Sequence, residues 1–228
     1  MKNVLVVGAS SGIGKSLTQL LQEEGHNVWG TYKSNELAGS QFHYLDVLEE
    51  DLSLNFLPET LDGLVYCPGS INLKPFARLK PSAFEEDYRL QVIGAIKVLQ
   101  AALKPLKKSS AASVVFFSTV AVQAGFNFHA QVAASKGAIE GLTRALAAEF
   151  APRIRVNCIA PSLTDTPLAG KLLNSEEKKA ANAQRHPLKK IGTAEDIAEM
   201  ASFLLSDKSA WISGQVMHVD GGMSNLKV

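Results

Sequence analysis

The fold is decided by the opening stretch Val4-Leu5-Val6-Val7-Gly8-Ala9-Ser10-Ser11-Gly12-Ile13-Gly14, which precedes residues with the spacing of an amphipathic helix. The apolar run before the first glycine predicts a buried strand. Gly8 permits a tight turn, Gly12 lets the backbone approach a phosphate, and Gly14 allows the helix to lie close to the sheet. The N-terminus of that helix offers unpaired N–H groups and a partial positive charge. The stretch therefore predicts a site for the pyrophosphate of a dinucleotide.

Strand-like and helix-like segments alternate along the rest of the chain, which predicts a parallel sheet with helices on both faces. The 228 residues suit one α/β domain over residues 1–228, because a chain of this length buries an ample core. We expect a single-domain Rossmann fold, a doubly wound parallel sheet of about seven strands. Strands are expected at 4–7, 27–32, 41–45, 61–67, 113–118, 155–159 and 215–219, and helices at 13–24, 81–103, 130–150 and 193–205.

One long segment, 161–190, is polar, rich in lysine and weakly patterned. It predicts a mobile substrate loop or lid within the domain. Together with 71–81 and 125–131 it would shape the substrate pocket, and the identity of the substrate is not encoded in any motif. Thr193 is expected to cap the next helix, since acidic residues follow in its first turn.

The composition argues against several classes of partner. The net charge is +1 and 20% of the residues are charged, which gives no reason to expect a nucleic acid or an anionic membrane as partner. No stretch approaches the roughly 20 apolar residues that cross a bilayer. Cys67 and Cys158 lie in apolar runs and are expected to be buried thiols of a cytoplasmic protein. The histidines lack the spacing of metal ligands, so no metal site is expected.

The glycine spacing of the opening turn, Gly-xxx-Gly-x-Gly, resembles that of the short-chain dehydrogenase/reductase family, and of its 3-oxoacyl-acyl-carrier-protein reductase type in particular. The resemblance runs from Lys2 to Gly222 and includes the closing motif 211–222. It implies a nicotinamide cofactor and oxidoreductase chemistry on a carbonyl, alcohol or enoyl group of a small molecule. It also implies assembly as a homotetramer or homodimer.

In an open α/β sheet the ligand lies beyond the carboxyl ends of the strands. This rule and the resemblance imply that the cofactor is bound by Gly8, Ser10, Ser11, Gly12, Ile13, Gly14, Lys33, Ser34, Asp46, Val47, Gly69, Lys136, Pro161, Thr164 and Thr166. No acidic side chain follows the second strand to hold a ribose 2′-hydroxyl. Lys33 and Ser34 would instead bind a 2′-phosphate, which favours NADP(H) over NAD(H). The alternative is that Lys33 is a solvated surface charge.

Asp46, Ser162 and Thr166 are the positions that the family pattern bears on most directly. Asp46 would meet the adenine, and the alternative is that it is a helix N-cap. Ser162 stands where the family has a glycine after Pro161, while Thr166 matches and would contact the pyrophosphate or the carboxamide.

The family's chemistry rests on an Asn, a Ser, a Tyr and a Lys. The Tyr hydroxyl moves the proton, and the Lys lowers the pKa of the phenol. Lys136 matches the Lys, so Val132, one helical turn earlier, occupies the Tyr position. Thr119 stands in the Ser position and Gln91 in the Asn position. Because valine neither titrates nor forms hydrogen bonds, the usual proton donor is missing.

Three interpretations of Val132 stay open. In the first, the chain is an oxidoreductase with another proton source, which is His129, Ser135, Tyr88 or a water held by Lys136. Histidine titrates near neutrality, and the 2,4-dienoyl-CoA reductase branch of the resembled superfamily also keeps the Lys without this Tyr. In the second, the chain is a catalytically inactive NAD(P)-binding pseudoenzyme with a sensing or scaffold role. In the third, Val132 is a change from the natural sequence.

Overall fold

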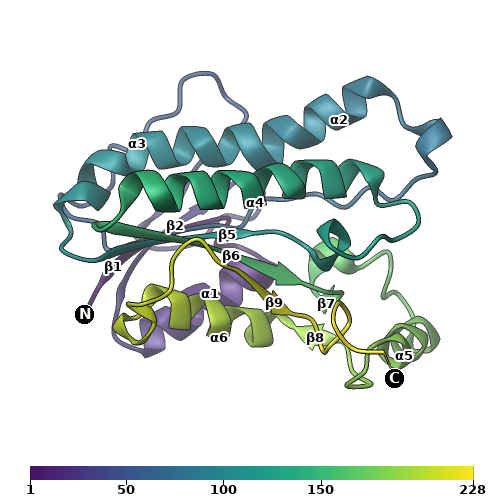
Figure 1. Ribbon diagram of the computed structural model, residues 1–228. Helices are drawn as coiled ribbons and strands as arrows, with labels where there is room; N and C mark the ends of the chain where they lie inside the picture. Colours follow the sequence, from purple (N-terminus) through teal and green to yellow (C-terminus); the bar gives the residue numbers. More distant parts are fainter. Residues whose placement is uncertain (228) are drawn as a thin grey trace.

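A seven-stranded sheet runs through the middle of the molecule between two layers of helices (Figure 1). The computed structural model describes residues 1–227. The strands of the sheet are β1 Asn3–Val7, β2 Asn27–Tyr32, β3 Phe42–Tyr44, β4 Gly63–Tyr66, β5 Ala112–Phe117, β6 Ile154–Pro161 and β9 Val216–Val219. They pair in parallel in the order β3-β2-β1-β4-β5-β6-β9. The predicted doubly wound Rossmann fold is therefore confirmed.

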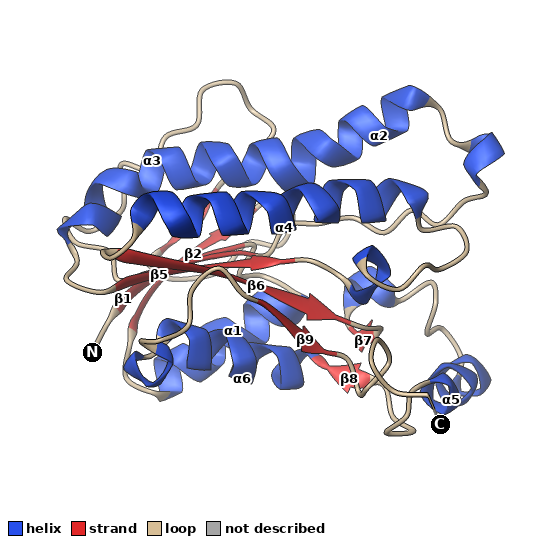
Figure 2. Ribbon diagram, viewed as in Figure 1, coloured by secondary structure: helices blue, strands red, loops and turns tan. Residues whose placement is uncertain are grey.

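Helices cover both faces of this sheet (Figure 2). On one face lie α1 (Gly12–Glu23) and α6 (Ala194–Leu205). On the other lie α2 (Pro81–Tyr88), α3 (Gly94–Lys108) and α4 (Ala130–Phe150). Alternate side chains of β1 enter opposite cores, Leu5 in one and Val6 in the other. This burial on both faces is the reason why the first strand is an uninterrupted apolar run.

A π-helical turn divides the helix that the sequence predicts over 81–103. This turn, η2 (Arg89–Ile93), joins α2 to α3, which continues through Pro105 to Lys108. Turns of this kind are rare and occur frequently at functional sites. Gln91 lies within the turn, so its side chain leaves the helix in a register that a regular α-helix would not give.

The segment 161–190 contains regular structure. β7 (Thr164–Asp165) pairs with β8 (Gly192–Thr193), and α5 (Glu176–Arg185) lies at one end of the molecule, apart from both helical layers (Figure 1). The sequence of α5 has no apolar face, and none of its residues is buried. The expected loop thus includes a helix, while its action as a lid stays a prediction.

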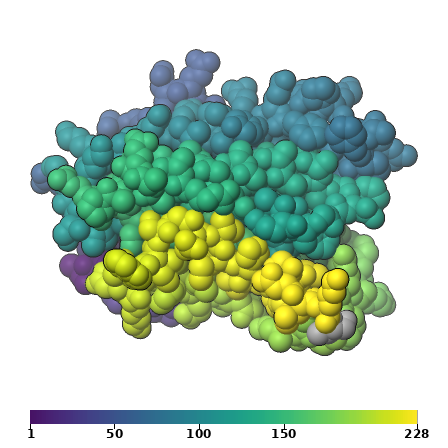
Figure 3. All heavy atoms as spheres, viewed as in Figure 1, coloured from purple at the N-terminus to yellow at the C-terminus, as the bar shows by residue number. Residues whose placement is uncertain are grey.

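The start of α6 matches the predicted cap. Asp196 N donates to Thr193 Oγ1 at 3.1 Å, and Thr193 N donates to Asp196 Oδ2 at 2.9 Å. These reciprocal bonds form a capping box. The chain then returns through β9, and its C-terminal part covers the face below α4 (Figure 3). Within residues 1–227, no helix has both the length and the apolar character of a membrane span.

Candidate active site

The opening turn has almost no room for side chains. Gly8 has a φ of 81°, a left-handed conformation that favours glycine. A Cβ added to Gly14 would lie 2.2 Å from the carbonyl oxygen of Gly8, so the first turn of α1 lies directly against the glycine turn. Ala9 N donates to Thr31 O at 2.8 Å, which ties the turn to β2. The strand, turn and helix N-terminus expected for a pyrophosphate are all present, and the binding itself stays a prediction.

Thr166 lies against the same turn. A Cβ added to Gly12 would lie 3.3 Å from Thr166 Cβ and 3.8 Å from Pro167 Cδ. Thr166 follows β6 and β7, whereas Gly12 begins α1, so the sheet brings together two residues that are far apart in the sequence. Both are predicted cofactor ligands, and their proximity supports that pairing.

Lys33 and Asp46 form an ion pair beyond the ends of β2 and β3. Lys33 Nζ lies 2.6 Å from Asp46 Oδ2, and this hydrogen bond raises the pKa of Lys33 and lowers the pKa of Asp46. Asp46 Oδ1 also accepts from Leu48 N at 3.0 Å within a turn. No helix follows at residues 47–50, so the alternative role of a helix N-cap is wrong. Ser34 nearby is exposed, whereas Val47 is buried in the core. Val47 can therefore meet a cofactor only through its backbone.

A cavity of about 280 Å³ opens beyond the carboxyl ends of the strands. The predicted site residues that line it are Ile13, Gly69, Gln91, Thr119, His129, Lys136, Pro161, Thr164 and Thr166. Much of the remaining lining is apolar: Ile71, Leu73, Phe126, Leu168, Leu172 and Met223. The other predicted residues lie outside this cavity, around the glycine turn and after β2 and β3: Gly8, Ser10, Ser11, Gly12, Gly14, Lys33, Ser34, Asp46 and Val47.

Lys136 is buried in the wall of this cavity. It lies one turn after Val132 on α4, and both side chains border the cavity. Burial lowers the pKa of Lys136 to about 8, because the ammonium ion loses its hydration, and Asp87 and the two cysteines offset only part of this effect. Burial also raises the pKa of Cys67 and of Cys158 to about 12, so both thiols are neutral near pH 7. The lysine amine is therefore poised to gain or lose a proton near neutral pH.

Gln91 presents an unused acceptor to the same space. Its Nε2 donates to Asp87 Oδ2 at 2.8 Å, while its Oε1 is buried and has no hydrogen-bond partner among residues 1–227. A Cβ added to Gly69 would lie 3.3 Å from Gln91 Oε1 and 3.8 Å from Lys136 Nζ, so both atoms face the gap beside this glycine. A buried acceptor without a partner costs about 1–3 kcal/mol. Such an atom next to a cavity indicates a site for a ligand or water.

Asp87 is a site residue that the sequence did not reveal. Its buried carboxylate accepts hydrogen bonds from Gln91 Nε2 and Ser70 Oγ, and Ser70 borders the cavity. Asp87 precedes Gln91 by four residues, the spacing at which helical side chains meet. That spacing is the signal that could have identified it.

Thr119, the hydroxyl in the Ser position, and the side chains proposed as proton donors differ in position. Thr119 borders the cavity, and its Oγ1 accepts from Ala121 N at 3.3 Å. His129 also borders the cavity, and its Nδ1 lies 2.8 Å from Asn127 O. Ser135 is buried and Tyr88 is 41% exposed, and neither is part of the cavity lining in the described chain. Of the three side chains proposed from the sequence as proton donors, His129 alone borders the cavity within residues 1–227.

Ser162 and His186 form a partly buried pair that the sequence did not reveal. His186 is 3% exposed, and its Nε2 lies 2.8 Å from Ser162 Oγ. The signal for this pair was the serine at a position where the resembled family has glycine. Among residues 1–227, no three His, Cys, Asp or Glu side chains are grouped so as to hold a metal ion.

The chain is similar to known proteins in both sequence and fold. The chain matches the family described as Enoyl-(Acyl carrier protein) reductase over residues 8–224. It is 32% identical over 243 residues to the 3-oxoacyl-acyl-carrier-protein reductase FabG of Chlamydia trachomatis, covering 98% of this chain and 97% of that protein. A solved short-chain type dehydrogenase/reductase from Mycobacterium ulcerans is 29% identical with a TM-score of 0.88, covering 98% of this chain and 90% of the other. The chain belongs to the short-chain dehydrogenase/reductase family.

This membership assigns the chain to the NAD(P)-dependent oxidoreductases as a class. A further member of similar structure, ElxO with NADP bound, is 26% identical with a TM-score of 0.86, covering 99% of this chain and 100% of the other. The short-chain dehydrogenase/reductase fold accounts for the position of the cavity, at the carboxyl ends of the strands. It does not account for Val132 beside a retained lysine.

Proposed function

We propose that the chain is an NADP(H)-dependent oxidoreductase that acts on a carbonyl, alcohol or enoyl group without a tyrosine acid. The observation that carries the proposal is the buried amine of Lys136, which shares the cavity with Thr119 and the unpaired Oε1 of Gln91. Burying a lysine amine costs free energy, so a buried lysine in the wall of a cavity indicates a functional role.

The residues present fit a nicotinamide dinucleotide. The close-packed glycine turn offers backbone N–H groups to the pyrophosphate, and Thr166 lies beside it. Lys136 would hold the nicotinamide ribose, with Gln91 Oε1 accepting from a water or ligand in the gap beside Gly69. When bound, the reduced nicotinamide supplies a hydride. Lys136 then stabilises negative charge that develops on the substrate, because its ammonium ion lies in a mostly apolar cavity.

The preference for NADP(H) rests on Lys33. Its side chain is 54% exposed beyond β2, so it can turn toward a 2′-phosphate while Asp46 remains nearby. No acidic side chain at residues 31–34 would repel that phosphate. The NADP found in the ElxO structure supports the same preference.

The substrate that we propose is an acyl thioester with an oxo or enoyl group near the thioester. The apolar side chains of the cavity suit an acyl chain, and the polar atoms at Thr119, Lys136 and Gln91 suit its reacting end. The matched family and the relative from Chlamydia trachomatis carry acyl-carrier-protein reductase names. A screen of NADPH oxidation against oxoacyl and enoyl thioesters of several chain lengths tests this choice, and activity confined to small polar carbonyls would contradict it.

Val132 favours a second candidate, a pseudoenzyme that binds the nucleotide and does not turn over. Val132→Tyr and Val132→Phe separate the two, since they add the same ring with and without a hydroxyl. An oxidoreductase oxidises NADPH as the unmodified protein and loses this activity in Lys136→Met. A pseudoenzyme binds NADPH in calorimetry but does not oxidise it, and only the Val132→Tyr variant shows NADPH oxidation.

A further inference from the structure

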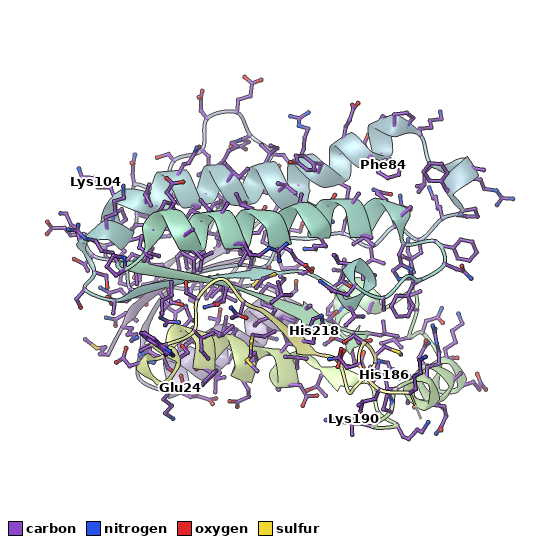
Figure 4. All side chains as sticks on the ribbon, in the orientation of Figure 1. Glu24, Phe84, Lys104, His186, Lys190 and His218 are labelled. Atoms are coloured by element: carbon purple, nitrogen blue, oxygen red, sulfur yellow. The ribbon has the colours of Figure 1, made fainter. Side chains whose placement is uncertain are left out.

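The wall of the cavity near α5 contains a chain of three hydrogen-bonded groups. His186 Nε2 lies 2.8 Å from Ser162 Oγ, and His186 Nδ1 lies 2.9 Å from Asn182 O. His186 directly follows α5, and Figure 4 shows it between α5 and the C-terminal segment. A Cβ added to Gly221 of that segment would lie 3.6 Å from the imidazole. The ring is therefore fixed from two sides.

These contacts determine where the hydrogens lie. The carbonyl of Asn182 only accepts, so His186 Nδ1 carries a hydrogen in both protonation states. In the neutral imidazole, Nε2 has no hydrogen and accepts the one on Ser162 Oγ. In the imidazolium, Nε2 donates to Ser162 Oγ, and the hydroxyl hydrogen is free to point elsewhere. Protonation of His186 thus makes Ser162 an available donor while both contacts persist.

The pair also borders two cavities. Ser162 and His186 line the cavity that contains Lys136, and both line a second cavity of about 190 Å³. The lining of the second cavity includes the charged residues Lys190, Asp196 and Asp220. It offers His186 a source of protons that is separate from the substrate cavity.

The charged groups around His186 come from each neighbouring element. Arg185 precedes it at the end of α5 and borders the substrate cavity. Lys190 is paired with Asp196 of α6 at 3.3 Å. Asp220 accepts hydrogen bonds from Gly222 N and Ser224 N at 2.8 and 2.9 Å. Both signs of charge therefore lie on the elements around the ring.

We propose that Ser162 and His186 form the proton relay that takes the place of the missing tyrosine, an inference that rests on the proposed function. As the substrate carbonyl carbon gains the hydride, its C=O π pair moves onto oxygen. Ser162 Oγ–H breaks as the new O–H bond of the product forms. Ser162 regains a hydrogen from His186 Nε2, and the neutral imidazole takes up a proton from the second cavity. In the oxidative direction the same transfers run in reverse.

In this relay Ser162 touches the substrate, and His186 acts through it. The other histidine at the cavity, His129, lies next to a loop residue in a left-handed conformation, Phe128 with a φ of 70°. Its Nδ1 contacts the backbone carbonyl of Asn127, and it has no hydroxyl partner among residues 1–227. The tyrosine-bearing members of the family do not need a serine at position 162, which explains how it can be a glycine there.

The test measures steady-state NADPH oxidation with an oxoacyl thioester for Ser162→Ala, Ser162→Gly and His186→Asn. Asparagine keeps a donor for the Asn182 carbonyl but cannot titrate. We expect kcat to fall by about 10²-fold or more in each variant, with KM and NADPH affinity nearly unchanged. The acidic-to-neutral limb of the kcat profile should disappear in His186→Asn. His26→Gln, a histidine change at the opposite end of the sheet, where His26 Nδ1 accepts from Lys2 N, is the matched control.

The decisive comparison repeats Ser162→Ala in a Val132→Tyr background. If the relay supplies the proton, the restored phenol makes Ser162 dispensable, and the loss shrinks to a few-fold. An equal loss in both backgrounds would show a structural role and overturn the relay. Full activity of Ser162→Ala in the unmodified background would overturn the relay alone. Absence of turnover in the unmodified protein, with NADPH bound, would overturn the proposed function and the relay with it.

Discussion

The two ends of the binding site are built differently. At the cofactor end, the glycine turn is shaped by the backbone contact between Gly14 and Gly8, and its residues follow one another in the sequence. At the substrate end, Gln91, Thr119, Lys136, Ser162 and His186 come from five separate segments. The first end keeps the family pattern, and the second departs from it. Cofactor binding and catalysis should therefore respond to different mutations.

The largest effect is expected at the substrate end. Lys136→Met removes the ammonium ion while filling the same volume, and we expect turnover to fall by about 10²–10⁴-fold. NADPH affinity should fall far less, because the glycine turn is intact. Calorimetric titration with NADPH beside turnover assays checks both values. An equal loss of binding and turnover would mean that the two ends are not separable.

The second prediction concerns the cofactor end. Gly14→Ala places a Cβ 2.2 Å from the Gly8 carbonyl oxygen, so the turn must move. We expect NADPH affinity to fall on the order of 100-fold, about 2.7 kcal/mol, and stability to fall by about 1–3 kcal/mol. Gly125→Ala is the control, because an added Cβ there meets nothing within 4 Å. Unchanged binding in Gly14→Ala would remove the turn from the site.

The two ends also differ in how far the sequence predicts them. The glycine turn and α4, with its bounds at 130 and 150, follow from local patterns and agree with the structure. The π-helical turn at Gln91 does not follow from a local pattern. There Gln91 donates to Asp87, and Asp87 also accepts from Ser70, which comes from another segment. The Ser162–His186 pair connects the end of β6 to α5, an exposed helix without an apolar face. No periodic pattern of apolar residues in the sequence therefore predicts this pair. Local signals thus describe the cofactor end, and tertiary contacts make the substrate end.

A third prediction uses the buried amine as a probe of stability. The pKa of Lys136 is about 8 in the folded chain and 10.5 in the unfolded chain, so between these values the unfolded state binds more protons. The contribution of this residue to the free energy of unfolding therefore rises with pH over that window, and its cost is complete below pH 8. Lys136→Met should be more stable than the unmodified protein at pH 7, by about 1–3 kcal/mol.

Denaturant unfolding of both proteins at a series of pH values checks this. The stability difference should shrink as the pH rises above 8. A constant difference would mean that the pKa of Lys136 is the same in the folded and the unfolded chain. Taking the difference between the two proteins cancels the contribution of ionisable groups that do not interact with Lys136.

The smallest effect is expected at the edge of the cofactor end. Lys33→Glu should lower the affinity for NADPH relative to NADH by about tenfold, or 1.4 kcal/mol, because it places a negative charge near the 2′-phosphate. Stability should change little, since the Lys33–Asp46 pair is solvent-exposed on the lysine side. Lys15→Glu, an exposed lysine on α1, is the control for net charge. An unaltered preference would return Lys33 to a solvated surface charge.

The most direct measurement is a single-turnover experiment with the unmodified protein, NADPH in the site and an oxoacyl thioester added in excess. The proposed function predicts oxidation of the bound NADPH by the unmodified protein, its loss in Lys136→Met, and retained NADPH binding in both. Bound NADPH that stays reduced with every oxoacyl and enoyl thioester, and is oxidised only after Val132→Tyr, would contradict it.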